Sequence, residues 1–135
     1  MVIVDSSVWI DALRGVANPQ TLWLTFAIPQ AEVGLTSLIL CEVLQGVRSR
    51  TQLKGFQRDL LELPVYEAAS KELAIQSAKN YLRLRALGMT VRSTINCMTA
   101  TFCIESGFGL LHHDRDYDPF KDHLGLQVVE PFAGN

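Results

Sequence analysis

Acidic side chains follow two short apolar stretches of this sequence, at points where buried strands are expected to end. Asp5 comes directly after the apolar residues 2–4, and Asp114 and Asp116 come shortly after the apolar pair 110–111. Short continuous apolar runs of this kind are typical of buried parallel strands. Because ligand sites in parallel sheets lie at the carboxyl ends of the strands, we expect these carboxylates to meet at one edge.

Two further polar residues are placed to join these acids. Glu42 lies about one turn into a predicted helix among apolar neighbours, and Asn96 lies in the first turn of a helix capped by Ser93 or Thr94. Clustered carboxylates repel one another unless a cation lies among them, and Mg²⁺ prefers oxygen ligands. A bound divalent cation can orient a water, lower its pKa and neutralise charge on a phosphodiester. The pattern therefore predicts a divalent-cation site suited to phosphodiester hydrolysis.

Alternating strands and helices are expected to position these side chains. Apolar runs bounded by acids, glycines or prolines predict strands at residues 2–4, 33–35, 61–65, 109–112 and 127–129. Capping residues and apolar spacing predict helices that start near residues 6, 19, 36, 52, 66 and 93. The helix from 66 to 87 is expected to be the longest. This alternation predicts an α/β fold with a mostly parallel sheet and helices on both faces.

Composition narrows the class of protein. The 135 residues fit one domain, and 48% hydrophobic with 19% charged residues excludes a disordered tail. No apolar run reaches 18 residues, and the first residues do not resemble a secretory signal. Three cysteines without a CxxC pair favour reduced thiols in a cytoplasmic protein. A net charge of −2 excludes a general nucleic-acid coat but allows an enzyme that acts on RNA.

The ordered set of motifs resembles a PIN-domain ribonuclease, most closely the VapC toxins of bacterial VapBC toxin–antitoxin pairs. The motifs are residues 2–10, Glu42 on its helix, residues 92–97 and residues 110–117. Each is weak alone, but their order is specific, and the resemblance covers essentially the whole chain. It implies a single PIN domain over residues 1–135, a three-layer α/β/α fold with a mostly parallel sheet of four or five strands.

The resemblance also implies a site. The family uses four acids to bind Mg²⁺ or Mn²⁺ and to hydrolyse single-stranded or structured RNA. By position, Asp5 is the first acid and Glu42 the second. Asp114 is the best candidate for the fourth, and Asp116 is close enough to share or replace its role. Ser7 matches a small hydroxyl position beside the metal.

Asn96 is the departure from the family pattern, because it stands where the family has its third acid, an aspartate. An amide oxygen is a weaker ligand for a hard cation, and losing an oriented ligand commonly costs about 10–100-fold in metal affinity or activity. Our hypothesis is that Asn96→Asp yields a Mg²⁺-dependent ribonuclease from a nearly inert chain. Two origins of the amide stay open, an engineered replacement that spares the host, which we favour, or a natural weakened copy. The alternative function is a non-catalytic module that binds RNA or an antitoxin.

Partners follow from the same resemblance. It implies a VapB-type antitoxin whose C-terminal segment wraps the toxin, a toxin homodimer, and a heterotetramer or larger assembly with the antitoxin, with no membrane partner. The RNA class is transfer or ribosomal RNA. Arg92 and Arg115 are candidate contacts to RNA phosphates beside the acids. Trp23, with Leu22 and Leu24 beside it, is a candidate lining of a groove for an antitoxin helix.

Several other residues have simpler interpretations. Asp11 is expected to face solvent, Asp118 to lie in a hydrated turn before Pro119, and the cysteines to lie in the core. His112 and His113 suggest zinc, but neighbouring residues on a strand point to opposite faces, which argues against a zinc site.

Two other classes of small parallel α/β domain fit poorly. A response-regulator receiver needs paired acids after the first strand and a lysine after a late one, but Ser6 follows Asp5. A phosphatase of the haloacid dehalogenase type needs a second aspartate two residues after the first, where this chain has Ser7.

Overall fold

A parallel sheet lies at the centre of the fold in this computed structural model, which describes residues 1–30 and 32–131. Within those residues the sheet has five strands in the order β3-β2-β1-β4-β5, and every neighbouring pair is parallel. The strands are β1 (Val2–Val4), β2 (Val33–Thr36), β3 (Val65–Tyr66), β4 (Gly109–Leu111) and β5 (Gln127–Val128). The central strand β1 thus pairs with β2 on one side and β4 on the other.

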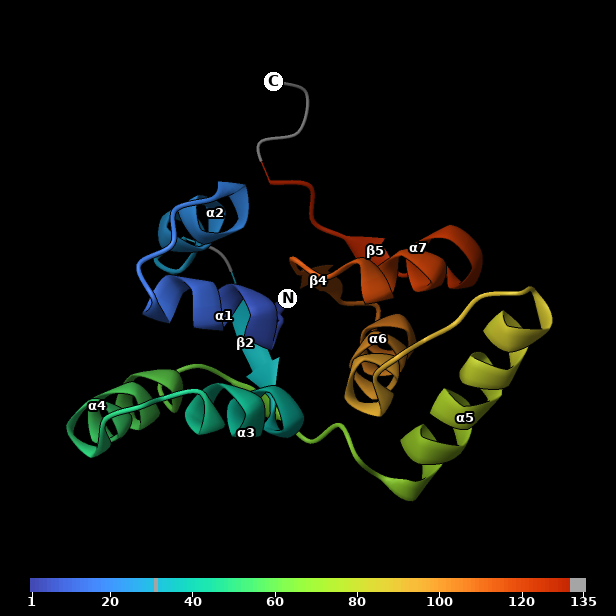
Figure 1. The fold of residues 1–135 in the computed structure, drawn as a ribbon, viewed down its shortest axis with the longest axis horizontal. Coiled ribbons are helices and arrows are strands. Elements are labelled where there is room, and N and C mark those ends of the chain that lie inside the picture. The colour runs from blue at the N-terminus through green and yellow to red at the C-terminus, as the bar shows by residue number, and fades with distance from the viewer. Residues whose placement is uncertain (31, 132–135) are drawn as a thin grey trace.

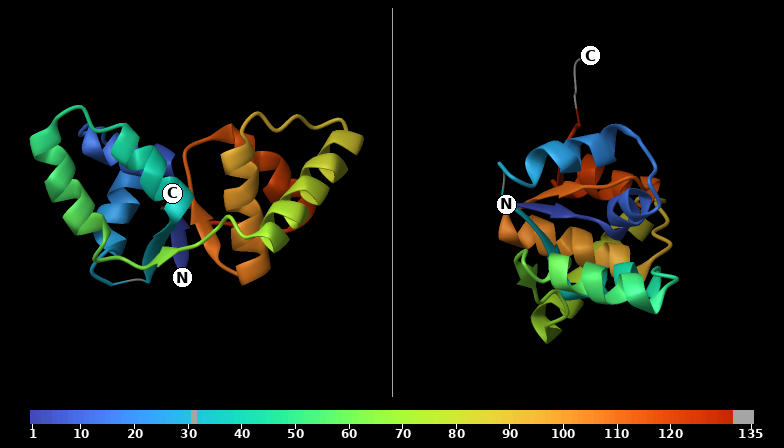
Figure 2. Two further views of the ribbon diagram at one scale, coloured as in Figure 1. Left: turned by 90° about the horizontal axis from the view of Figure 1, so that it is seen from below. Right: turned by 90° about the vertical axis from the view of Figure 1, so that its left-hand side faces the viewer.

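Helices cover both faces of this sheet (Figure 1). They are α1 (Ser6–Leu13), α2 (Pro19–Ala27), α3 (Ser37–Gln45), α4 (Arg50–Leu60), α5 (Lys71–Ala86), α6 (Thr94–Ser106) and α7 (Asp118–Leu124). Figure 2 shows α1 to α4 on one side of the sheet and α5, α6 and α7 on the other. The predicted three-layer α/β/α arrangement is therefore confirmed, with a sheet that is parallel throughout the described residues.

Local capping explains where the helices around the site begin. Helix α3 starts after Thr36, whose hydroxyl accepts from the Ile39 N–H, and α6 starts after Ser93, whose hydroxyl accepts from the Asn96 N–H. Helix α1 is capped by Asp5, the residue directly before it. Asp5 can do this because its carboxylate, at the end of β1, accepts from the N–H two residues on.

Two predicted elements have different bounds in the structure. The long helix begins at Lys71 after the cap Ser70, because Tyr66 pairs with Thr36 as part of β3. The residues around Pro119 form helix α7 and not a hydrated turn, so that prediction was wrong. Proline is favoured in the first turn of a helix, where its missing N–H has no partner to lose.

The core lies between the sheet and the two helix layers. The inward residues of β1, β2 and β4 are buried, and Tyr117 and Phe120 are the largest of the fully buried side chains. Cys97 and Cys103 belong to this core, but Cys41 is exposed, which corrects the prediction for that residue. Among the described residues, no helix has both the length and the apolar character needed to cross a membrane.

Candidate functional site

The predicted site residues come from four separate segments that meet beyond the carboxyl ends of β1 and β4. Asp5 follows β1, and its N–H donates to the carbonyl oxygen of Leu111, the last residue of β4, at 2.9 Å. Asp114 and Asp116 lie at the short 3₁₀ helix η1 (Arg115–Tyr117) that follows β4. Glu42 comes from α3 and Asn96 from the first turn of α6. The structure thus brings the predicted acids and the amide into one region.

Asp5 is held by donors on both carboxylate oxygens. Its Oδ2 accepts from the Ser7 N–H at 3.1 Å and from the Ser7 hydroxyl at 2.7 Å. Its Oδ1 accepts from the Tyr117 hydroxyl at 2.6 Å. Only 2% of Asp5 is exposed, so these donors replace water around a buried acid. Ser7 therefore contacts the first acid through its N–H and its hydroxyl, and its hydroxyl oxygen also accepts from the His113 N–H at 3.0 Å.

The side-chain amide of Asn96 points its hydrogens at the other two aspartates. Its Nδ2 donates to Asp114 Oδ2 and to Asp116 Oδ2, at 3.2 Å each. Its Oδ1 accepts from the Tyr117 hydroxyl at 3.1 Å. The opposite amide orientation would set Oδ1 against two carboxylate oxygens, so the hydrogen bonds fix the orientation described. Asn96 therefore supplies donors, where an aspartate would supply charge.

Asp114 and Asp116 have different partners. Asp116 accepts from the Arg92 N–H at 2.9 Å and the Ser93 N–H at 3.3 Å, which ties η1 to the start of α6. Asp114 is exposed and accepts from the Asp116 N–H at 2.9 Å, a bond within its own turn. Asp116 is thus engaged with the backbone, and Asp114 is the more accessible of the two carboxylates.

Glu42 lies near the other acids in a half-buried position. Its Oε1 accepts from the Ser6 hydroxyl at 3.0 Å. Burial raises the pKa of Glu42 above its usual value, the Ser6 hydrogen bond opposes this rise, and the charges of Asp5 and Asp114 add to it. A nearby positive charge would stabilise the ionised form of a carboxyl group in this setting.

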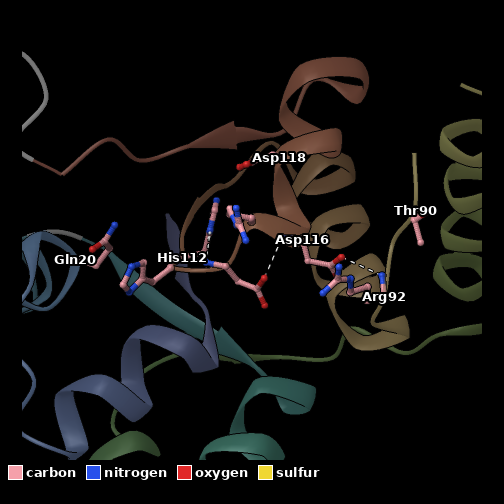
Figure 3. Close-up of a pocket in the computed structure, with 9 residues that line it drawn as sticks. Gln20, Thr90, Arg92, His112, Asp116 and Asp118 are labelled. Carbon is pink, nitrogen blue, oxygen red and sulfur yellow. Dashed lines mark hydrogen bonds between the residues drawn. The ribbon is translucent and has the colours of Figure 1, made fainter. Parts of the chain in front are cut away.

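A polar pocket of about 870 Å³ opens beside Asp114 and Asp116 (Figure 3). It is also lined by Gln20, Thr90, Arg92, His112, His113, Arg115 and Asp118. The two candidate RNA-contacting arginines therefore share a pocket with two of the candidate acids. Both histidines line it as well, because β4 ends at Leu111 and the strand alternation expected for them does not apply.

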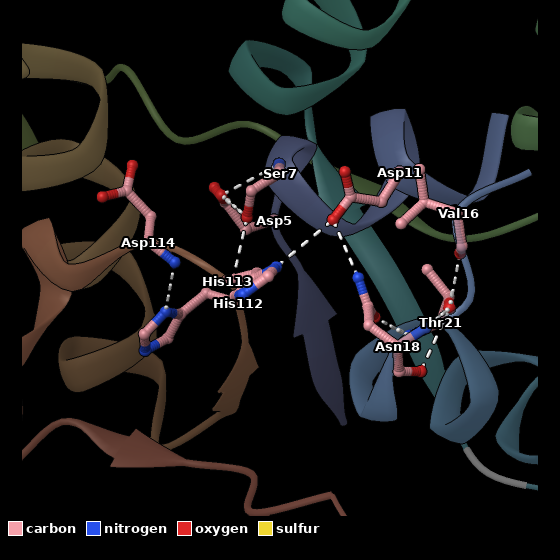
Figure 4. Close-up of polar contacts among 9 residues, drawn as sticks. All are labelled: Asp5, Ser7, Asp11, Val16, Asn18, Thr21, His112, His113 and Asp114. Carbon is pink, nitrogen blue, oxygen red and sulfur yellow. Dashed lines mark hydrogen bonds and ion pairs between the residues drawn. The ribbon is translucent and has the colours of Figure 1, made fainter. Parts of the chain in front are cut away.

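The rim of this region includes a hydrogen-bond network that the sequence did not predict (Figure 4). Asp11 Oδ2 accepts from Asn18 Nδ2 at 3.0 Å and lies 3.3 Å from His113 Nδ1. Asp11 was expected to face solvent, but its side chain is only 27% exposed and joins α1 to the loop after β4. His112 has a different partner from His113, because its Nδ1 accepts from the Asp114 N–H at 3.1 Å. Burial lowers the pKa of His112.

Sequence reasoning missed two side chains that contact the acids. Tyr117 is fully buried and touches both Asp5 and Asn96 through its hydroxyl, and Ser6 holds Glu42. The aromatic residue that follows the acid-rich stretch was the available signal for Tyr117. A serine directly after an acid gives no comparable signal for Ser6.

The donor chemistry of the site suits a hard divalent cation, because its side chains offer carboxylate, amide and hydroxyl oxygens. The arrangement is incomplete, however. Among the residues the structure describes, no group of three or more histidine, cysteine, aspartate or glutamate side chains is close enough to hold a metal ion. The Asn96 amide accounts for part of this, since its N–H groups lie between Asp114 and Asp116.

Comparisons with known proteins agree with the ordered motifs. The PIN domain family model matches residues 2–122. Among characterised proteins, VapC ribonuclease Mb1587 of Mycobacterium bovis and ribonuclease VapC11 of Mycobacterium tuberculosis are each 27% identical to this chain over 134 residues. Those matches cover 96% of this chain and 98% of each relative. The resemblance inferred from the sequence is therefore confirmed.

A solved structure supports the fold independently. VapBC2 from Rickettsia felis, determined bound to a DNA fragment from its promoter, aligns with a TM-score of 0.75 at 14% sequence identity. The alignment covers 96% of this chain and 98% of that one. At such low identity, the likeness concerns the fold, and it confirms the predicted α/β class.

Proposed function

Because the chain belongs to the PIN domain family, we propose that it is a VapC-type ribonuclease toxin whose divalent-metal site is weakened by Asn96. The reaction is the hydrolysis of RNA phosphodiesters, with transfer or ribosomal RNA as the substrate class and the cytoplasm as the place of action. The 27% identity to VapC ribonucleases over nearly the whole chain supports this reaction class.

The observation that carries the proposal is the meeting of Asp5, Glu42 and the Asp114/Asp116 pair from separate segments, and the hydrogen bonds around Asn96 support the weakening. Asp5, Glu42 and Asp114 are the residues that would hold Mg²⁺ or Mn²⁺, with Asp116 beside them. When bound, such a cation supplies an activated water and neutralises phosphodiester charge. In this chain the Asn96 Nδ2 lies 3.2 Å from both Asp114 and Asp116. Its two N–H groups partly stabilise the negative charge of these carboxylates, although the amide itself is neutral.

The basic side chains of the pocket complete the proposed substrate site. Arg92 and Arg115 line the same pocket as Asp114 and Asp116 and are exposed. Arginines hold phosphate oxygens and position a strand without reading its sequence. We therefore assign them to contacts with RNA phosphates beside the acids.

Asn96→Asp tests the proposal directly. We expect Mg²⁺-dependent cleavage of bulk bacterial transfer or ribosomal RNA at least about 10-fold faster than with the unaltered chain, and abolished by a chelator. We also expect Mn²⁺ to raise the melting temperature of Asn96→Asp more than that of the unaltered chain, since a ligand stabilises the state that binds it.

Two control variants make the result specific. Gln57→Glu makes the same change from amide to carboxylate at an exposed position of α4, away from the site, and it should produce no metal-dependent cleavage. Adding Asp5→Ala to Asn96→Asp should remove the gained activity. If Asn96→Asp shows neither cleavage nor a Mn²⁺-dependent rise in melting temperature, the proposal is wrong.

A non-catalytic module is the second candidate, because the Asn96 amide satisfies the neighbouring acids without a cation. In that case the chain binds RNA or an antitoxin and does not cut. RNA affinity that is equal for the unaltered chain and Asn96→Asp, with no turnover by either, would favour this candidate.

An antitoxin helix has a suitable groove on the face formed by α1, α2 and α4. The groove has a volume of about 370 Å³ and is lined mainly by apolar side chains, among them Trp9, Leu13, Leu24, Ile28, Phe56 and Leu60. Trp23, the main residue expected at such a groove, does not line it and packs against the core, and Leu22 is exposed outside it. Leu24 is among the lining residues. An amphipathic helix places apolar residues into such a groove. The proposed occupant is a VapB-type antitoxin encoded beside this chain.

Ile28→Lys tests the groove, since Ile28 is 45% exposed and can change without loss of the core. We expect at least a 10-fold weaker complex with the product of the neighbouring reading frame, measured by calorimetry. Leu22→Lys is the matched control, because Leu22 on α2 is 55% exposed but lies outside the groove. Equal affinity of the two variants would contradict the assignment.

A further inference from the structure

Tyr117 connects the acids of the site from the buried side. The residue is fully buried at the end of η1, directly after Asp116 and before α7. Its hydroxyl lies 2.6 Å from Asp5 Oδ1 and 3.1 Å from Asn96 Oδ1. The ring packs beside His112, with 4.8 Å between the ring centroids. One side chain thus joins the end of β1, the start of α6 and the turn after β4.

A tyrosine hydroxyl has one proton to donate, and here two oxygens lie within reach of it. The shorter distance makes Asp5 the main acceptor. A phenol is a donor at neutral pH, because its ordinary pKa is about 10.

Asp5 depends on this donor because it is almost completely buried. Ser7 supplies both hydrogen bonds to Oδ2, and Tyr117 supplies the bond to Oδ1. Donors on both oxygens fix the plane of the carboxylate as well as its position. We propose that Tyr117 is a positioning residue of the divalent-metal site, which orients Asp5 through its hydroxyl and couples it to position 96.

This inference rests on the proposed metal site and adds a residue to it. Replacing Tyr117 by phenylalanine keeps the ring in the core but removes the donor to Oδ1. The Asp5 carboxylate then loses part of its orientation, and its charge loses a hydrogen bond in a place that water does not reach. Both effects weaken a bound cation, and loss of a partner that orients a ligand commonly costs about 10–100-fold in metal affinity.

The experiment measures Mn²⁺ affinity, by paramagnetic resonance of the free ion, in chains that carry Asn96→Asp. We expect Tyr117→Phe to weaken Mn²⁺ binding at least about 10-fold in this background. Tyr66→Phe is the matched control, because Tyr66 lies on β3 with its ring against Phe102 and Phe108, and its loss of a hydroxyl should leave the affinity unchanged. Melting temperatures in chelator show whether each variant is folded.

The outcomes separate this inference from the proposed function. If Asn96→Asp binds Mn²⁺ and Tyr117→Phe binds it equally or more tightly, the role of Tyr117 is wrong and the metal site stands. If Asn96→Asp does not bind Mn²⁺ more tightly than the unaltered chain, the metal site fails and the inference fails with it. Weaker Mn²⁺ binding by Tyr117→Phe but not by Tyr66→Phe, with both variants folded, supports the inference.

Discussion

The amide at position 96 changes the charge balance of the site without changing its shape. With aspartate there, four or five carboxylates would crowd together with no amide donor between Asp114 and Asp116, and like charges at short range raise one another's pKa. With Asn96, each of those two carboxylates accepts an N–H at 3.2 Å. The site of this chain is therefore compatible with the folded state in the absence of a cation.

Glu42 gives a prediction for the effect of pH on stability. Its pKa is raised in the folded state, so the folded protein binds this proton more tightly than the unfolded chain does. The stabilisation that protonated Glu42 gives to the folded state is fully present below its pKa in the unfolded chain, about 4.3. It is lost as the pH rises through its pKa in the folded state. At pH 7 the ionised carboxylate is therefore unfavourable. Glu42→Gln, which keeps an acceptor for Ser6, should be more stable than the unaltered chain at pH 7.

Urea unfolding at pH 7 and near pH 4 checks this sign. The gain in free energy of unfolding should shrink at the lower pH, where Glu42 becomes protonated and resembles glutamine. Glu105→Gln is the control, since Glu105 is exposed on α6, and its effect on stability should be close to zero at both pH values. A larger gain at the lower pH would contradict the assigned direction of the shift.

At the scale of elements, capping and hydrophobic patterns were enough to predict most of the fold. The apolar runs predicted the five described strands, although β3 begins only at Val65, the last residue of its predicted range. Pro19 and Ser93 marked helix starts that the structure confirms. Helix α7 was missed because a proline after aspartate is equally typical of a turn. The start of α5 was misplaced because Tyr66 has no local signal for its pairing with β2.

The candidate site was predictable only in part, for a similar reason. Sequence patterns locate the strands, and the carboxyl ends of neighbouring parallel strands lie at the same edge of a sheet. Asp5 and Asp114 could therefore be placed at neighbouring strand ends from the sequence. Contacts made by Tyr117 and Asp116 depend on how η1 turns after β4. Asp116, for example, accepts from the backbone N–H groups of Arg92 and Ser93, 24 and 23 residues away. No local pattern encodes such a pairing.

Strand packing gives a prediction that compares two glycines. A Cβ at Gly34 in β2 would lie 2.9 Å from the Pro64 carbonyl oxygen, a backbone atom beside β3. A Cβ at Gly55 in α4 would meet nothing within 4 Å. Gly34→Ala should lower the free energy of unfolding by about 1–3 kcal/mol through overpacking. Gly55→Ala should raise it by about 0.5–1 kcal/mol through helix propensity.

Chemical denaturation of the two variants measures this difference, and each variant serves as the control for the other. Gly34→Ala tests whether β3 packs as closely on β2 as the structure shows, since β3 is a short edge strand. Equal stability of Gly34→Ala and the unaltered chain would mean that β3 can move away from β2 without a loss in the free energy of unfolding.

At the scale of the whole molecule, the distribution of charge matters more than the net charge of −2. The chain has 14 acidic and 12 basic side chains, so no general attraction to RNA is expected. The acids gather beyond β1 and β4, and Arg92 and Arg115 lie at the pocket beside them. RNA binding by this chain should therefore depend on a few phosphate contacts near the site.

The salt dependence of RNA binding tests this arrangement. Each phosphate contact with single-stranded RNA adds about 0.7 to the slope of log affinity against log salt concentration. Arg92→Gln and Arg115→Gln should each weaken binding and reduce the slope by about that amount, as measured by fluorescence anisotropy in a chain that keeps Asn96. Arg58→Gln on α4 removes the same charge from a residue paired with Asp59, outside the pocket. If all three variants change the slope equally, the binding follows net charge and the pocket is not the RNA site.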